Sequence, residues 1–210
     1  MKINNILELL DKMIPNPKCE LNYNKDYELL IATVLSAQCT DKRVNEVTKA
    51  LFKKYNLETL STANIKDIEK IIYSCGNYRK KAQYIISISK SLLENYNGVV
   101  PNNRDYLESL PGVGRKTTNV VLSNIFDVPA IAVDTHVERV SKRLNLANEK
   151  DTVLEVEKKL MKKIPKNKWS RVHHQLVLFG RYTCKSIKPE CEKCLLKEHC
   201  KYYKKINKKI

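Results

Sequence analysis

Apolar residues recur along this chain with the spacing of amphipathic helices. In residues 3–13 they form one helical stripe, and Pro15 and Pro17 end it. The same periodicity continues through most of the sequence, and only residues 128–133 have the pattern of an extended stretch. The pattern therefore predicts a mainly helical protein with about ten helices. The predicted helices cover residues 3–13, 27–36, 41–52, 65–72, 78–96, 104–109, 115–126, 135–144, 156–164 and 169–179.

Several of these helices begin at residues whose side chains accept hydrogen bonds from free backbone amides. Two pairs also have the spacing of a capping box, in which the two residues bond to each other's backbone. At the other end of the last long helix, Gly180 is expected to terminate it. The predicted caps are Thr40 or Asp41, Asn64, Thr135 with Glu138, and Thr152 with Glu155.

Composition supports a helical fold and indicates a polyanionic partner. The 210 residues include only 5 Gly and 7 Pro, which argues against collagen-like, disordered and turn-rich β proteins. The length suits one sizeable domain or two small ones. Lys and Arg number 39 against 23 acidic residues, a formal charge of +16. Such an excess favours nucleic acid over an anionic membrane surface, and a solvated lysine-rich surface is the alternative.

No apolar run approaches the roughly 20 residues needed to span a bilayer. The first residues also lack the apolar stretch and cleavage site of a secretory signal. We therefore expect a cytoplasmic protein without a membrane partner. In a reducing cytosol, clustered thiols are better candidates for metal ligands than for disulfides.

A glycine-containing turn separates the helices predicted at 104–109 and 115–126. In this turn, Leu110-Pro111-Gly112-Val113-Gly114, the glycines carry no side chain that would keep a ligand from the backbone. The following helix start adds unpaired amides and a partial positive charge, so the turn and helix together suit a phosphate. The alternative is a plain helix connection with a glycine cap.

Lys116 and Asp134 each occupy the start of a predicted helix. A lysine nucleophile must be neutral, and positive charge is disfavoured at a helix start beside Arg115. A solvated or phosphate-facing lysine is the ordinary alternative. An aspartate at this kind of position commonly caps the helix, and capping and catalysis are compatible.

Four of the 7 cysteines lie within 17 residues near the C-terminus. Their spacing, C-x6-C-x2-C-x5-C, fits a compact iron–sulfur cluster better than the paired cysteines usual for zinc. The other three thiols are scattered, and we interpret them as core or ordinary cysteines. The clustered residues are Cys184, Cys191, Cys194 and Cys200, and the scattered ones are Cys19, Cys39 and Cys75.

The sequence Leu-Pro-Gly-Val-Gly-Arg-Lys-Thr at 110–117, with Val-Asp-Thr-His at 133–136, resembles the endonuclease III family of helix-hairpin-helix DNA glycosylases. This resemblance implies that Lys116 is the nucleophile and that Asp134 assists departure of a damaged base. It also implies a 4Fe-4S cluster held by the four clustered cysteines. Gln38 lies in a segment whose glutamine, in the family, enters the space left by a flipped nucleotide. Asn77 stands where the family commonly has an apolar wedge.

The resemblance covers residues 20 to 203 and implies an all-α fold of two lobes. One is a six-helix lobe at 20–128 with the helix-hairpin-helix, and the other combines 1–19 and 129–210 as a four-helix and iron–sulfur cluster lobe. The implied DNA-binding residues are Gln38, Leu110, Gly112, Gly114, Arg115, Thr117 and His136.

The implied activity is base excision repair by a monomer associated with the nucleoid. A bifunctional N-glycosylase and apurinic/apyrimidinic (AP) lyase would remove oxidised pyrimidines from double-stranded DNA and cleave abasic sites. One alternative is an adenine-specific mismatch glycosylase, which typically lacks the lysine and carries an extra C-terminal domain, whereas this chain has Lys116 and ends at Ile210. The other is a metal-stabilised DNA-binding module without catalysis.

Overall fold

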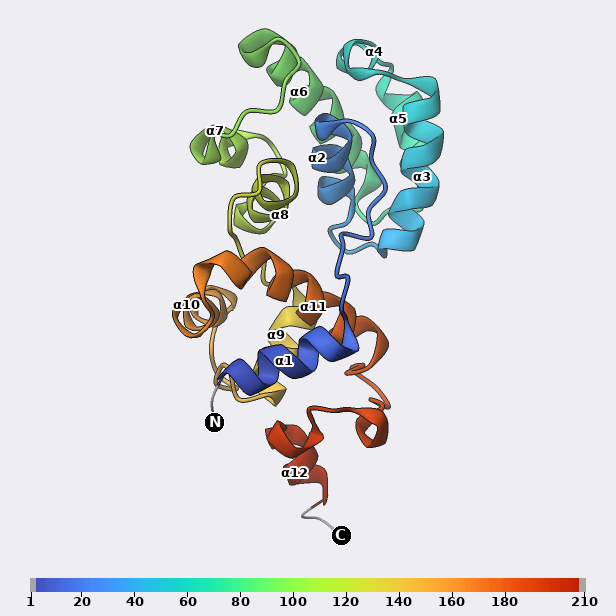
Figure 1. Cartoon of the computed structure of the whole chain (residues 1–210). Coiled ribbons are helices and arrows are strands. Elements are labelled where there is room, and N and C mark those ends of the chain that lie inside the picture. Colours follow the sequence, from blue (N-terminus) through green and yellow to red (C-terminus); the bar gives the residue numbers. More distant parts are fainter. Residues whose placement is uncertain (1–2, 208–210) are drawn as a thin grey trace. The chain divides into compact units, whose positions relative to one another are not determined.

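The computed structural model describes residues 3–207, and every regular element in that range is helical (Figure 1). The prediction of an all-α fold is confirmed. The α-helices are α1 (Ile3–Met13), α2 (Asp26–Leu35), α3 (Asp41–Lys54), α4 (Leu57–Ser61), α5 (Ile65–Ile72), α6 (Tyr78–Tyr96), α7 (Arg104–Ser109), α8 (Arg115–Ile125), α9 (Thr135–Arg143), α10 (Val153–Lys163), α11 (Trp169–Tyr182) and α12 (Lys201–Asn207). Three short 3-10 helices are η1 (Lys166–Lys168), η2 (Cys191–Lys193) and η3 (Lys197–His199).

Most predicted helices form within a residue or two of their expected bounds. Thr40 and Asn64 cap α3 and α5, and Thr152 forms a capping box with Glu155 at α10. The short helix α4 was not predicted; its start is fixed by a capping box of Asn56 and Thr59. Residues 128–133 are irregular rather than a strand. Without a second extended segment in the described chain, this stretch has no ladder partner.

The chain folds into two compact units. The hairpin unit comprises Cys19–Phe126 and holds α2 to α8. The terminal unit combines the residues up to Lys18 with those from Asp127 onward, and it holds α1 and α9 to α12. The two residues expected to be catalytic fall in different units, Lys116 in the hairpin unit and Asp134 in the terminal unit. Each lies at the start of a helix.

Helix α2 forms the centre of the hairpin unit. Nine of its ten residues are buried, because its sequence is apolar on all sides rather than on one stripe. It packs against α3, α6 and α8, while α4 and α5 pack on α6 (Figure 1). This packing fixes α8, which carries Lys116, and α6, which follows Asn77.

The terminal unit is built around α9 and α11. Helix α1 packs on α11, and α10 and α12 pack on α9. Gly180 does not end α11 as predicted but lies inside it. A Cβ at Gly180 would lie 2.8 Å from Cβ of His136, so glycine is needed there for close packing of α11 on α9. This tertiary requirement overrides the usual role of glycine as a helix end.

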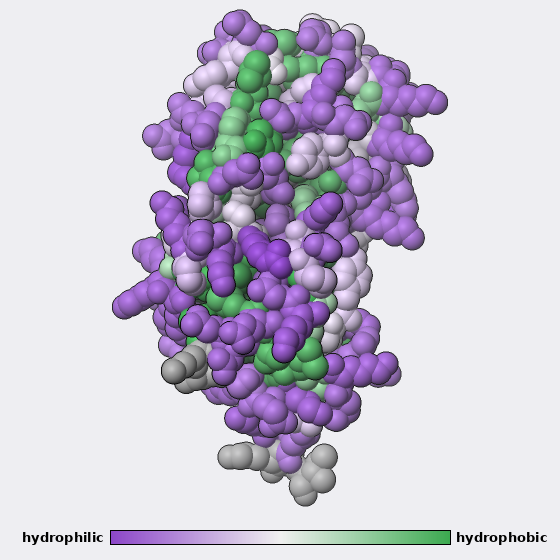
Figure 2. Space-filling model, viewed as in Figure 1, coloured by the Kyte–Doolittle hydropathy of each residue, from purple (hydrophilic) through white to green (hydrophobic). Residues whose placement is uncertain are grey.

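Hydrophilic side chains cover most of the molecular face in view in Figure 2. This agrees with the strongly basic composition. Among the described residues, no helix combines the length and apolar character that crossing a bilayer requires.

Candidate DNA-binding and catalytic site

The hairpin turn between α7 and α8 is anchored by two apolar side chains and exposes two glycines. Leu110 and Val113 are buried, and the amide of Val113 donates to the carbonyl of Leu110 at 3.1 Å. Gly112 and Gly114 are exposed. The turn therefore presents backbone to solvent while its side chains hold it to the core.

The two glycines serve different purposes. Gly112 has φ +77°, and a Cβ there would overlap the ring of Tyr84, so both its conformation and its surroundings require glycine. Gly114 has extended backbone, φ −110°, and a Cβ there would meet no atom within 4 Å. The fold does not require glycine at Gly114, but a side chain would cover the backbone beside the start of α8.

The first turn of α8 is suited to an anion. Gly114 is the N-cap and has no side chain to accept a bond from the first amides, and the turn holds no acidic residue. Its residues are Arg115 and Lys116, both exposed, and the half-buried Thr117. The helix dipole, two cations and unshielded amides together form a cradle for a phosphate.

A polar link across the hairpin keeps this cradle in place. Arg104 on α7 donates from Nη2 to Oδ1 of the buried Asn119 on α8 at 2.7 Å. It also donates from Nη1 to Glu108 on its own helix at 2.8 Å. The two helices are thereby fixed relative to each other on either side of the turn.

Lys116 is the second residue of α8, and its side chain is exposed. Its ammonium group has no partner within residues 3–207. A long side chain without an ion pair is available to meet a bound substrate, whereas Lys142 and Lys159 are held by Glu138 and Asp151.

Asp134 is the N-cap of α9, which corrects the prediction of a capping box by Thr135 and Glu138. Its Oδ1 accepts hydrogen bonds from the amides of His136 at 2.9 Å and Val137 at 2.8 Å. Both bonds use Oδ1, and Oδ2 takes no part in the cap. Thr135 is the first residue of the helix, so the better cap one position earlier determines where the helix begins.

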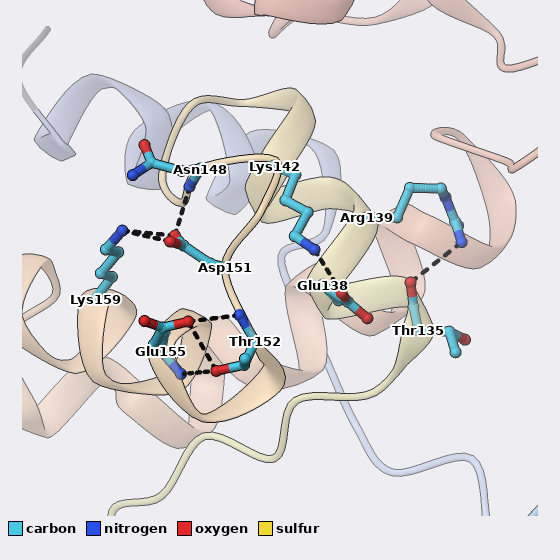
Figure 3. A network of polar contacts seen from close by, with 9 residues as sticks. All are labelled: Thr135, Glu138, Arg139, Lys142, Asn148, Asp151, Thr152, Glu155 and Lys159. Atoms are coloured by element: carbon cyan, nitrogen blue, oxygen red, sulfur yellow. Dashed lines mark hydrogen bonds and ion pairs between the residues drawn. The ribbon is translucent and has the colours of Figure 1, made fainter.

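A network of polar contacts rigidifies the segment that follows Asp134 (Figure 3). Along α9, Lys142 Nζ lies 2.6 Å from Glu138 Oε1. At the start of α10, Asp151 accepts a hydrogen bond from the amide of Asn148 at 2.6 Å and pairs with Lys159 at 2.7 Å. The first contact stiffens α9, the helix that Asp134 caps, and the other two hold the loop that follows α9 onto α10.

His136 is half-buried near the start of α9. Burial lowers its pKa, while the negative charge of Asp134 acts in the opposite direction. Its Nδ1 lies 3.3 Å from Nη2 of Arg139. A neutral imidazole packed against Gly180 suits a residue that orients the start of α9.

Gln38 and Asn77 meet in the hairpin unit, although they lie 39 residues apart. Asn77 donates from Nδ2 to Oε1 of Gln38 at 3.3 Å. Both residues are exposed and have left-handed backbone, with φ 56° and 55°. Lys81, which is buried, donates to the carbonyls of Leu35 and Ala37 and so holds the end of α2 beside Gln38.

All four clustered cysteines line one pocket in the terminal unit. Burial raises the pKa of Cys194 to about 11, and negative charge on the other three thiols would act in the same direction. Backbone N–H of Tyr203 donates to Sγ of Cys200 at 3.4 Å, and Arg143 Nη1 donates to Sγ of Cys184 at 3.3 Å. A cation bound among these four sulfurs would stabilise their thiolate forms, and donors to sulfur are typical of cluster sites.

Two arginines of α9, which the sequence did not single out, organise this cysteine loop. Arg143 donates to the carbonyl of Lys185 at 2.8 Å, and its guanidinium lies 4.1 Å from the ring centroid of Tyr202. Arg139 donates to the carbonyls of Gly180 and Cys184. Their i, i+4 spacing on one helix was the available signal, but it does not reveal a loop 41 residues away.

The arrangement of side chains around the cysteine pocket limits the kind of metal group that it can hold. Among the described side chains, no three of His, Cys, Asp or Glu are placed to hold a single metal ion. A four-iron cluster makes a different demand, since each thiolate binds a different iron and the sulfurs stand farther apart than around one ion. The shared pocket and the donors to sulfur therefore fit a cluster better than a single zinc.

Residues 31–166 match the family described as HhH-GPD superfamily base excision DNA repair protein. The hairpin turn with its exposed glycines lies inside this range. Fold and site thus define a base excision DNA repair protein with a helix-hairpin-helix.

Curated relatives refine this class. The chain is 52% identical to endonuclease III of Bacillus subtilis over 204 residues, covering 97% of this chain and 93% of the relative. It is 44% identical to endonuclease III of Escherichia coli, covering 96% of each.

Solved structures agree with these relatives. A non-covalent endonuclease III–DNA complex matches with a TM-score of 0.94 and 52% identity, covering 98% of this chain and 97% of that one. A trapped endonuclease III–DNA covalent intermediate, an estranged-adenine complex, matches with a TM-score of 0.93, the same identity and the same coverage. The chain belongs to the endonuclease III family, and it is accordingly a DNA glycosylase and AP lyase of base excision repair.

Proposed function

We propose that this protein removes oxidised pyrimidines from double-stranded DNA and cleaves the resulting abasic site through a Schiff base on Lys116. The observation that carries the proposal is the exposed, unpaired ammonium group of Lys116 at the start of α8, directly after the hairpin turn. A relative with 52% identity forms a covalent intermediate with DNA, which supports a nucleophile on the protein.

The hairpin turn and the start of α8 bind the DNA backbone. A phosphate accepts hydrogen bonds from the exposed backbone around Gly112 and Gly114, and Arg115 and Thr117 add side-chain contacts. Leu110 holds the turn to the core. Because these donors read no base, the hairpin positions the duplex and does not itself select the lesion.

The reaction begins when the damaged nucleotide leaves the stack. Gln38 occupies the space that it vacates, supported by Asn77 through their hydrogen bond. Asn77 has no apolar surface to wedge between bases, so in this chain an amide pair takes the place of the apolar wedge common in the family.

Lys116 Nζ, as a neutral amine, attacks the anomeric carbon of the deoxyribose while the base leaves with the electron pair of the glycosidic bond. The amine loses a proton to give an aminal, the C1′–O4′ bond of the deoxyribose ring then breaks while O4′ takes up a proton, and the open sugar is held as a protonated imine. The imine acidifies the C2′ carbon, and loss of a proton there expels the 3′ phosphate by β-elimination. Asp134, through its Oδ2, stabilises positive charge on the sugar and moves protons in the later steps. His136 orients the start of the helix that Asp134 caps.

The cysteine pocket holds a 4Fe-4S cluster, with Cys184, Cys191, Cys194 and Cys200 as ligands. When bound, the cluster supplies structural cross-linking rather than base chemistry, because the loop it joins is too short to build a core. The protein acts as a monomer in the cytoplasm, associated with the nucleoid through DNA.

Duplexes carrying one lesion each test this function. The protein should release thymine glycol or another oxidised pyrimidine and nick the strand, and it should nick a duplex with a preformed abasic site. Intact strands in every duplex would support a mere DNA-binding module. Excision confined to adenine in a mismatch would support the adenine-specific alternative.

A further inference from the structure

Two cysteines outside the cysteine pocket lie close together in the hairpin unit. Sγ of Cys39 donates to Sγ of Cys75 at 3.6 Å, although the residues are 36 positions apart in the sequence. Cys39 follows the end of α2, and Cys75 follows the end of α5. The scattered positions of these thiols in the sequence gave no sign of this pairing.

The thiols lie next to Gln38 and Asn77, the two amides proposed to act in the space that the flipped nucleotide vacates. Gln38 immediately precedes Cys39, and Asn77 follows Cys75 by two positions. The loops meet closely, since a Cβ at Gly76 would lie 3.4 Å from the carbonyl oxygen of Gln38. Among the described side chains, a hydrogen bond of 3.3 Å joins Gln38 to Asn77, and the thiol pair is a second contact between these loops.

The two thiols differ in accessibility. Cys39 is half-buried and reachable by a small reagent, whereas Cys75 is only 1% exposed. Burial and the hydrogen bond with Cys39 raise the pKa of Cys75 to about 12, against the opposing charges of Lys81 and Arg43. Greater exposure suits Cys39 to react first with an oxidant, and the 3.6 Å between the sulfurs puts Cys75 within reach of the mixed disulfide, although its raised pKa makes this second step the slower one.

We propose that Cys39 and Cys75 are a modification site, at which a small-molecule disulfide of the glutathione type oxidises them to a reversible intramolecular disulfide that slows base removal. The effect on base removal rests on the function proposed above. An S–S bond of about 2.05 Å would draw the sulfurs together by about 1.5 Å. Gln38 and Asn77 would move with them from their positions in the reduced protein.

The exchange proceeds in two balanced steps. The Cys39 thiolate attacks one sulfur of the oxidant, forming a mixed disulfide and releasing one small thiolate. The Cys75 thiolate then attacks the Cys39 sulfur, forming the internal disulfide and releasing the second small thiol. Two electrons pass from the protein to the oxidant, and the two thiol protons end on the two released thiols. Because a thiol of high pKa leaves slowly, the internal disulfide should persist until an added dithiol reduces it.

The test uses the full-length holoprotein treated with glutathione disulfide. Remaining thiols are alkylated, and peptides are mapped by mass spectrometry for a link between Cys39 and Cys75. Base release from a thymine glycol duplex is measured before oxidation, after oxidation and after reduction with dithiothreitol. Cys39→Ser and Cys75→Ser remove the pair, and Cys19→Ser is the matched control for loss of an unrelated thiol.

The wild type and Cys19→Ser should form the link and release the base about tenfold more slowly, with full recovery on reduction. Cys39→Ser and Cys75→Ser should keep their rate in oxidant. The proposal is overturned if glutathione adds to other thiols but no Cys39–Cys75 link forms, if the linked protein keeps its rate, or if Cys39→Ser slows equally. Absence of base release from the reduced wild type would count against the proposed function, and the mass spectrum would still decide whether the link forms.

Discussion

Oδ1 of Asp134 accepts a hydrogen bond from the backbone amide of Val137 at 2.8 Å, so the carboxylate proposed to act in catalysis is also the N-cap of α9. One oxygen of this carboxylate therefore has a structural role, and the other is free of the cap for the chemical role that we propose. Substitutions that keep the cap but remove the charge separate these roles.

Asp134→Asn should retain the fold and lose most of the activity. Asparagine caps helices about as well as aspartate, so the free energy of unfolding should change by only a few tenths of a kcal/mol. Loss of the carboxylate should slow base release by about 10²-fold or more. Asp134→Ala, which also removes the cap, should lower the free energy of unfolding by about 1 kcal/mol. Thermal unfolding and single-turnover base release measure the two effects, and an active Asp134→Asn protein would show that Asp134 only caps.

Gly112 and Gly114 offer a matched pair for the phosphate cradle. Gly112→Ala should destabilise the protein by about 1 kcal/mol or more, because φ is +77° and the Tyr84 ring is in the way. Gly114→Ala should leave stability unchanged, since its Cβ meets nothing. Both should weaken DNA binding in a fluorescence titration at fixed salt. Unaltered affinity in Gly114→Ala would argue that phosphate does not approach this backbone.

The cysteine pocket should contain iron and acid-labile sulfide in equal amounts and give the protein visible colour. Cys194→Ala should abolish both, and Cys19→Ala should retain them. Arg143→Gln should lower cluster retention, because Arg143 donates to Sγ of Cys184 and to the carbonyl of Lys185. A colourless protein that contains one zinc ion would contradict the cluster assignment.

Acid should destabilise the protein through His174. Burial lowers its pKa, so the folded state binds the proton less readily than the unfolded chain does. As pH falls through the unfolded pKa of about 6.5, the unfolded state takes up more protons and the free energy of unfolding decreases. His174→Gln should therefore flatten the decrease between about pH 7 and pH 5. Urea unfolding of both proteins at several pH values measures this free energy. Parallel pH profiles for the wild type and His174→Gln would show that His174 does not cause the loss of stability in acid.

Local sequence signals predicted most helices because their causes are local. An apolar stripe or a capping residue such as Thr40 or Asn64 acts within a few positions. Two local predictions were wrong, one because a neighbouring residue competed for the same capping position and one because of tertiary packing. Asp134 capped α9 in place of Thr135 because it offers a stronger acceptor one residue earlier. Gly180 continued its helix because a second helix lies against it.

Parts of the candidate site depend on distant contacts that no local pattern carries. The sequence identified the hairpin glycines and the four clustered cysteines because their spacing is itself the signal. It did not identify Arg143, whose partners lie 41 to 43 residues away, or the contact of Cys39 with Cys75. Such contacts form only when the helices and loops that bear these residues pack together.

Borohydride trapping tests the central claim, that Lys116 is the nucleophile. Reduction in the presence of an abasic-site duplex should give a covalent protein–DNA adduct that maps to Lys116. Lys116→Ala should give none, while Lys90→Ala, which loses an exposed lysine paired only with Glu94, should trap like the wild type. An adduct formed by Lys116→Ala at the wild-type rate would contradict the assignment.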